Sequence, residues 1–227
     1  QFYTITFFSS ALCFHEKRHF MVSTQFFTLT SIYFLALLSP GQDFFLIIKH
    51  ALAHGYKKAW WSCWGIASGN ALYIALAYIG HTALSTYPTL ISFIECGGAI
   101  FLFYLGCLLF LAPKPRIDTS LHKKSKMAFT LFMQGFLSAL LNPKNILFYF
   151  SLLFTIIEPT TALPIKLFYA LWMIGMLLVW DMFVALLFGN QHALKLLPYL
   201  GFVQKVIGVG LMGFSLHLAL KWVMDAK

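Results

Sequence analysis

Six apolar runs, each long enough to cross a lipid bilayer, constrain this 227-residue chain more than any other feature. A spanning helix needs roughly 20 mostly apolar residues, each adding about 1.5 Å of rise. The runs cover 26–48, 60–80, 90–111, 128–157, 165–188 and 202–220. They leave little chain for a soluble domain, and charged residues make up 10% of the sequence, against about a quarter in soluble proteins. The sequence predicts an all-α integral membrane protein with six transmembrane helices.

The basic residues between the runs predict the orientation. Loop 49–59 contains three lysines, loop 81–89 contains no Lys or Arg, and loop 112–127 contains five Lys and Arg residues. Because short cytoplasmic loops are enriched in Lys and Arg, we expect the first and third loops in the cytoplasm and both termini in the periplasm. The net charge of +9 is then a topology signal, and we expect no nucleic-acid partner.

An internal repeat divides the chain into two halves. An offset of 103 residues aligns Ala36–Pro40 with Ala139–Pro143. Three spans, a basic linker and three further spans match this repeat. Because three is odd, the second copy must cross the membrane upside down relative to the first, as in many secondary transporters. We therefore expect one three-helix repeat at 21–111, a cytoplasmic linker at 112–127 and an inverted repeat at 128–227.

Two of the runs contain a proline near their middle, as Ser39-Pro40 and as Asn142-Pro143. Proline removes a backbone donor, disfavours helical geometry in the residue before it and suits the first position of a new helix. We expect helix 1 to be broken at Pro40 and helix 4 at Pro143, each with a new N-terminus inside the membrane. The alternative is a pair of ordinary proline kinks that neighbouring helices satisfy.

The residues around each proline fit the start of a helix. Ser39 and Asn142 are both favourable N-cap residues. Gln42 completes a Ser-x-x-Gln capping box with Ser39, and Asn145 stands at the same place in the second copy. A helix N-terminus presents free N–H groups and partial positive charge, so each break suits an anion such as a carboxylate.

Ionisable residues inside the spans indicate a site. Asp43 and Lys144 each cost at least about 2.5 kcal/mol in the bilayer unless paired or hydrated. Asp43 is suited to hold a substrate ammonium or to carry a proton, and Lys144 to pair with Asp43 or to attract a carboxylate. Asp181 fits a place on the pathway and a structural role equally well. The candidate substrate-binding or coupling residues are Ser39, Pro40, Gly41, Gln42, Asp43, Asn142, Pro143, Lys144, Asn145 and Asp181.

Five motifs together resemble the LysE/RhtB family of amino-acid exporters. They are Leu37–Phe45, Gly65–Gly69, Tyr104–Gly106, Gly135–Leu137 and Leu141–Lys144. Their order and spacing cover essentially all of 21–227. Within the family, the Pro-Gly-x-Asp-Phe-Phe motif and the closing segment Gly213–Leu218 look most like the threonine efflux branch. The family usually has Pro-Gly-Pro, and Gln42 replaces the second proline here, so the first half-helix is less rigidly set.

The resemblance implies a multi-pass protein of the bacterial inner membrane that exports a small amino acid such as threonine or homoserine by proton exchange. Its partners would be the amino acid, protons and the lipid bilayer, and a homo-oligomer is compatible with the sequence. Neither a cofactor nor an enzymatic activity is expected.

Residues 1–20 fit poorly with the rest of the chain, and we expect Met21 to be the natural start and 1–20 to be an extension outside the fold. This segment contains His15-Glu16-x-x-His19, the pattern in which two histidines bind zinc and the Glu activates water. A membrane metalloenzyme is therefore an alternative function, and a non-transport membrane scaffold is another. A charged tail is favoured over zinc, because a catalytic zinc has three protein ligands.

Overall fold

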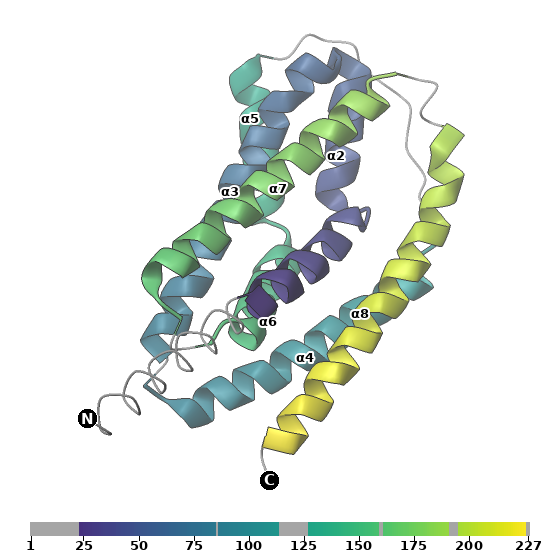
Figure 1. Cartoon of the computed structure of the whole chain (residues 1–227). Coiled ribbons are helices and arrows are strands. Elements are labelled where there is room, and N and C mark those ends of the chain that lie inside the picture. The colour runs from purple at the N-terminus through teal and green to yellow at the C-terminus, as the bar shows by residue number, and fades with distance from the viewer. Residues whose placement is uncertain (1–22, 85, 114–126, 159–160, 191–194, 226–227) are drawn as a thin grey trace, which may run out of the picture.

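The computed structural model describes residues 23–84, 86–113, 127–158, 161–190 and 195–225 (Figure 1). Within these ranges all the regular secondary structure is helical. The helices are Ser23–Leu38 (the first helix), α2 (Gln42–His54), α3 (Tyr56–Leu84), α4 (Pro88–Leu111), α5 (Ala128–Leu140), α6 (Pro143–Ile156), α7 (Leu163–Phe188) and α8 (Leu197–Asp225). The predicted all-α class is confirmed.

The helices agree with the six predicted spans. Four of them, α3, α4, α7 and α8, are individually long and apolar enough to cross a membrane. The first helix with α2, and α5 with α6, form two bent pairs that bring the count to six if each pair is one span. The protein is therefore an all-helical integral membrane protein.

The two bent pairs are broken where the sequence places its mid-span prolines. The first helix and α2 meet at an angle of 54°, and α5 and α6 meet at 59°. Each break leaves a short gap in the helix, at residues 39–41 and at residues 141–142. The expectation that helices 1 and 4 are broken at Pro40 and Pro143 is confirmed.

The two new helix starts differ in local structure. α6 begins at Pro143, and the Asn142 side chain caps it by accepting the Lys144 backbone N–H at 3.1 Å, as predicted. α2 begins at Gln42 with Gly41 as its N-cap residue, and no side chain caps it. The predicted capping box of Ser39 and Gln42 is therefore wrong. The extended backbone of Gly41 (φ −120°, ψ −167°) moves the helix start beyond the reach of Ser39.

The bundle has two distinct ends (Figure 1). At one, which we call the Gly55 end, lie the connection from α2 to α3, the start of α5 and the end of α7. Gly55 is the single residue between α2 and α3. Its φ of +81° is one that residues with a Cβ rarely adopt. At the other, the Tyr87 end, α3 ends and α4 and α7 begin. The two breaks lie between these ends.

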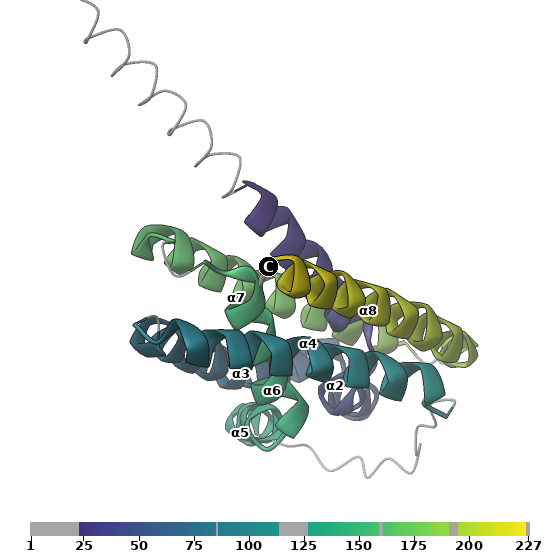
Figure 2. The same ribbon diagram turned by 90° about the horizontal axis from the view of Figure 1, so that it is seen from below.

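Two helix pairs pack with their backbones almost in contact. A Cβ at Gly65 of α3 would lie 2.0 Å from the carbonyl oxygen of Phe132 in α5, and one at Gly135 would lie 2.2 Å from that of Ser62. The second pair, α4 and α8, lie side by side (Figure 2). There a Cβ at Gly208 would lie 2.6 Å from the Gly106 oxygen. Such close approach through small residues is characteristic of membrane helices, and it holds α5 firmly against α3.

We predict that Gly65→Ala and Gly135→Ala each lower the thermal stability of the detergent-solubilised protein. The added methyl group meets backbone atoms that cannot rotate away, at a cost of about 1–3 kcal/mol or more. Gly97→Ala and Gly175→Ala are matched controls, since a Cβ at either position meets nothing within 4 Å. Equal melting temperatures for all four variants would contradict this packing.

Candidate functional site

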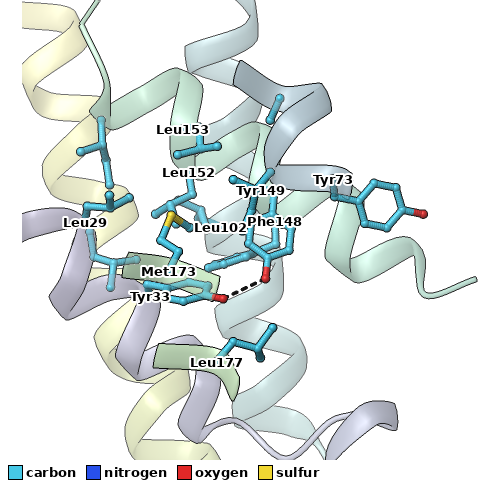
Figure 3. Packing of buried hydrophobic residues seen from close by; sticks show 14 of the residues in the cluster. Leu29, Tyr33, Tyr73, Leu102, Phe148, Tyr149, Leu152, Leu153, Met173 and Leu177 are labelled. Carbon is cyan, nitrogen blue, oxygen red and sulfur yellow. Dashed lines mark hydrogen bonds between the residues drawn. The ribbon is translucent and has the colours of Figure 1, made fainter. Parts of the chain in front are cut away.

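The apolar core consists of two separate clusters. The Tyr87-side cluster includes Leu29, Tyr33, Tyr73, Leu102, Phe148, Tyr149, Leu152, Leu153, Met173 and Leu177 (Figure 3). The Gly55-side cluster contains Phe44, Ile47, Ile48, Ala51, Ala59, Cys63, Ile66, Ala139, Val184, Ala185 and Phe188. Both clusters draw on several helices.

A layer of polar residues separates the two clusters. In three spans, segments with polar residues stand between a member of one cluster and a member of the other. These are Ser39–Asp43 between Tyr33 and Phe44, Asn142–Asn145 between Ala139 and Phe148, and Asp181 between Leu177 and Val184. We call this set the polar layer. It contains all ten candidate residues from the sequence.

Asp43, the second residue of α2, has partners for both carboxylate oxygens. Ser138 Oγ donates to Oδ1 at 2.6 Å, and Asn145 Nδ2 donates to Oδ2 at 3.1 Å. Asn145 also donates to the Ala139 carbonyl at 3.2 Å, which fixes its orientation. The start of a helix further favours an anion. Each side-chain oxygen of Asp43 therefore accepts a hydrogen bond.

Lys144 reaches across to the other break. Its Nζ donates to Ser39 Oγ at 3.4 Å and interacts electrostatically with Asp43. A Cβ at Gly41 would lie 3.7 Å from Nζ, so the ammonium group lies against the backbone of the first break. The acid of one broken span therefore lies near the base of the other, as the sequence suggested it could.

Asp181 is the third ionisable group of the polar layer. Its side chain is 5% exposed, and Oδ2 has no hydrogen-bond partner among the described residues. It interacts electrostatically with Asp43, Tyr33 and Tyr149. Unlike Asp43, Asp181 has a free acceptor inside the protein.

The other predicted residues lie around this centre with different exposures. Ser39 and Asn142 are buried, at 5% and 7% exposed. Pro40 is buried and Pro143 is exposed. Gln42 is exposed as well, and no hydrogen bond joins it to the partners of Asp43 described above, so its place in the sequence motif does not bring it to the centre.

The sequence reasoning missed several hydroxyl residues outside the polar layer as defined. Ser138 donates to Asp43, the hydroxyls of Tyr33 and Tyr149 are 2.9 Å apart (Figure 3), and the Tyr73 hydroxyl donates to the Leu140 carbonyl. Helical spacing could have found one of them. Tyr149 lies four residues after Asn145 on α6, and residues four apart on one helix share a face.

The metal hypothesis falls on a different part of the chain. The His15-Glu16-x-x-His19 pattern lies outside the described residues. Within the ranges that the structure describes, no group of three or more His, Cys, Asp or Glu residues could hold a metal ion.

Comparison with known proteins identifies the family of this chain. The sequence model of LysE type translocators matches residues 34–222. The chain belongs to this family. No solved structure matches it significantly.

Relatives include proteins named for the efflux of two amino acids. The chain is 31% identical to the leucine efflux protein of Klebsiella pneumoniae over 136 residues, which are 60% of this chain and 64% of that protein. It is 29% identical to the threonine efflux protein of Salmonella typhimurium over 128 residues, 55% of this chain and 62% of that one. These matches span less than two thirds of each relative. The threonine efflux protein of Escherichia coli K12 is 25% identical over 210 residues, 85% of this chain and 96% of that protein.

A double-mutant cycle tests the contact between the two breaks. We predict that Asp43→Asn and Lys144→Gln each destabilise the protein, because each leaves the opposite charge without its partner at a cost of about 1–3 kcal/mol or more. The double variant should lose less than the sum of the two. Thermal unfolding in detergent measures this coupling, with Lys49→Gln as the control, since Lys49 is exposed on α2. Strictly additive losses would show that the two side chains do not interact.

Proposed function

We propose that this protein exports small neutral amino acids, of the threonine or homoserine type, from the cytoplasm across the bacterial inner membrane in exchange for protons. The observation that carries the proposal is the juxtaposition of Asp43 and Lys144 in the polar layer, between two apolar clusters. A zwitterionic amino acid has one ammonium and one carboxylate group, which an acid and a base at one site can bind together. The printed names of the leucine and threonine efflux relatives support the same substrate class.

The two apolar clusters would act as the gates of this pathway. Because the two clusters lie on opposite sides of the polar layer along both broken spans and α7, transport would require one cluster to unpack at a time. We assign the Gly55 end to the cytoplasm, because the exposed residues Lys49, Lys57 and Lys58 lie near it and basic residues favour that side. The Tyr87 end would then face the periplasm.

We attribute the opening and closing of the two clusters to a movement of the proposed inverted repeats. Repeat 21–111 would rock against repeat 128–227 around the site, as in other transporters of this plan. Contacts between equivalent helices support the arrangement, because α3 packs on α7 and α4 packs on α8. The two broken spans meet in the same way, through Ser138, Asn145 and Asp43.

Asp181 is the residue that we assign to proton exchange. Both oxygens of Asp43 already accept hydrogen bonds, whereas Asp181 Oδ2 accepts none. Asp181 interacts electrostatically with Asp43 of α2, Tyr33 of the first helix, Tyr149 of α6 and Cys63 of α3. Two nearby carboxylates resist being ionised together, so one proton is most easily held on Asp181, whose Oδ2 accepts no hydrogen bond among the described residues.

Coupling then follows from competition for negative charge. A substrate ammonium that enters from the cytoplasm replaces the proton as the cation beside the two carboxylates, and Asp181 releases its proton to that side. After the substrate leaves to the periplasm, Asp181 takes up a proton from there and the empty protein returns. One proton enters the cell for each amino acid that leaves.

Reconstitution into liposomes separates the roles of the two acids. We predict that Asp181→Asn lowers efflux driven by a pH gradient at least tenfold. The variant should still exchange labelled for unlabelled threonine, because the ammonium site remains. Asp43→Asn should abolish both reactions. Glu95→Gln is the control, since Glu95 of α4 lies outside the polar layer.

The same assay, with threonine, homoserine and leucine as test substrates, decides the proposal itself. Efflux of none of the three under an imposed pH gradient would overturn amino-acid export of this class. Efflux by Asp181→Asn that still responds to the gradient would remove Asp181 from proton exchange.

A further inference from the structure

A second set of buried polar side chains lies near the Tyr87 end, away from the polar layer. His81 of α3 is 0% exposed and Lys166 of α7 is 7% exposed. Neither ring nitrogen of His81 makes a hydrogen bond within the described ranges, and nor does the buried hydroxyl of Tyr78. Burying polar groups without partners is costly, so this set calls for an explanation that the site above does not provide.

These residues converge from three helices. His81 interacts electrostatically with Lys166, and its ring packs edge-on against Phe154 of α6 with the centroids 5.1 Å apart. Tyr78 interacts electrostatically with Tyr169 of α7. Tyr78 and His81 are three residues apart, as are Lys166 and Tyr169, so each pair shares one helix face. We call His81, Lys166 and Tyr78 the basic cluster.

The cluster lacks an anion. It contains two bases and a hydroxyl, and in the described part of the chain no acidic side chain acts on His81 or Lys166. The backbone carbonyl of Ile157 acts on the His81 ring. In its protonated form the His81 ring carries two N–H donors, and the Lys166 ammonium and the Tyr78 hydroxyl are donors as well. An oxyanion among them would satisfy these donors and relieve the repulsion between the two bases.

We propose that the basic cluster is a second binding site for the carboxylate of the exported amino acid, used as it leaves toward the periplasm. This inference rests on the proposed function. The basic cluster lies toward the Tyr87 end, where α3 ends and α7 begins, and its Tyr78 packs against the Tyr87-side cluster, so it would stand on the route that opens when that cluster unpacks. The carboxylate would pass from Lys144 to Lys166 before release. Complete burial of His81 favours a small ligand from inside the protein over a lipid headgroup at the membrane surface.

Binding of single-charge probes tests the cluster apart from transport. Threonine and 3-hydroxybutyrate both carry a carboxylate, and the latter lacks the amino group, whereas threonine amide lacks the carboxylate. In nanodiscs of zwitterionic lipid, 3-hydroxybutyrate should raise the melting temperature of the wild type and of Lys144→Gln, but not of Lys166→Gln or His81→Gln. Threonine amide should have no effect through this site. Lys205→Gln, an exposed change on α8, is the control and should respond like the wild type.

Transport gives the second measurement. Threonine on the periplasmic side should inhibit efflux from wild-type liposomes, and Lys166→Gln should need at least a tenfold higher concentration for half inhibition. If 3-hydroxybutyrate stabilises Lys166→Gln and His81→Gln as well as the wild type, the inference fails. It also fails if anionic lipid in the nanodisc stabilises the wild type but not Lys166→Gln, while no carboxylate probe stabilises either protein. In either case, efflux by the wild type would leave the proposed function intact. If instead 3-hydroxybutyrate binds as expected but the wild type shows no efflux, the proposed function is overturned.

Discussion

A carboxylate inside a bilayer must find partners there, because an unpaired charge costs at least about 2.5 kcal/mol. Asp43 finds them in the other half of the chain, at Ser138 and Asn145, which are 95 and 102 residues away in sequence. Both donors flank the break between α5 and α6. The contact requires each span to open at its middle, and the bends of 54° and 59° meet that requirement. The rest of the bundle is arranged around this meeting of two broken helices.

The same arrangement separates rigid contacts from those that can open. α3 lies against α5 through Gly65 and Gly135, and α4 lies against α8 through Gly106 and Gly208, with almost no space for a side chain between them. Both pairs join one proposed repeat to the other. Rocking of the repeats would therefore pivot at these backbone contacts, while the larger side chains of the two apolar clusters separate and repack.

Much of this fold could be predicted because the bilayer imposes it. Span length and apolar composition located the four long spanning helices and the two bent pairs, and the two prolines located both breaks. The capping box at Ser39 and Gln42 was wrong, because the conformation of Gly41 moved the helix start. Ser138 and the pair of Tyr33 and Tyr149 were missed, since hydroxyl residues are common in membrane helices and their role depends on what lies opposite. His81 and Lys166 are distant in sequence and share no motif, so only packing reveals them.

The sequence by itself determined the class of protein, the position of each span, the two breaks and the presence of an acid and a base within the membrane. These properties follow from local chemistry, namely hydrophobicity, the missing N–H of proline and the cost of burying charge. The tertiary structure alone decided that Ser138 and Asn145 hold Asp43 while Asp181 keeps a free oxygen, and that His81 lies beside Lys166. Those facts depend on how distant helices approach one another, and no single stretch of sequence carries that information.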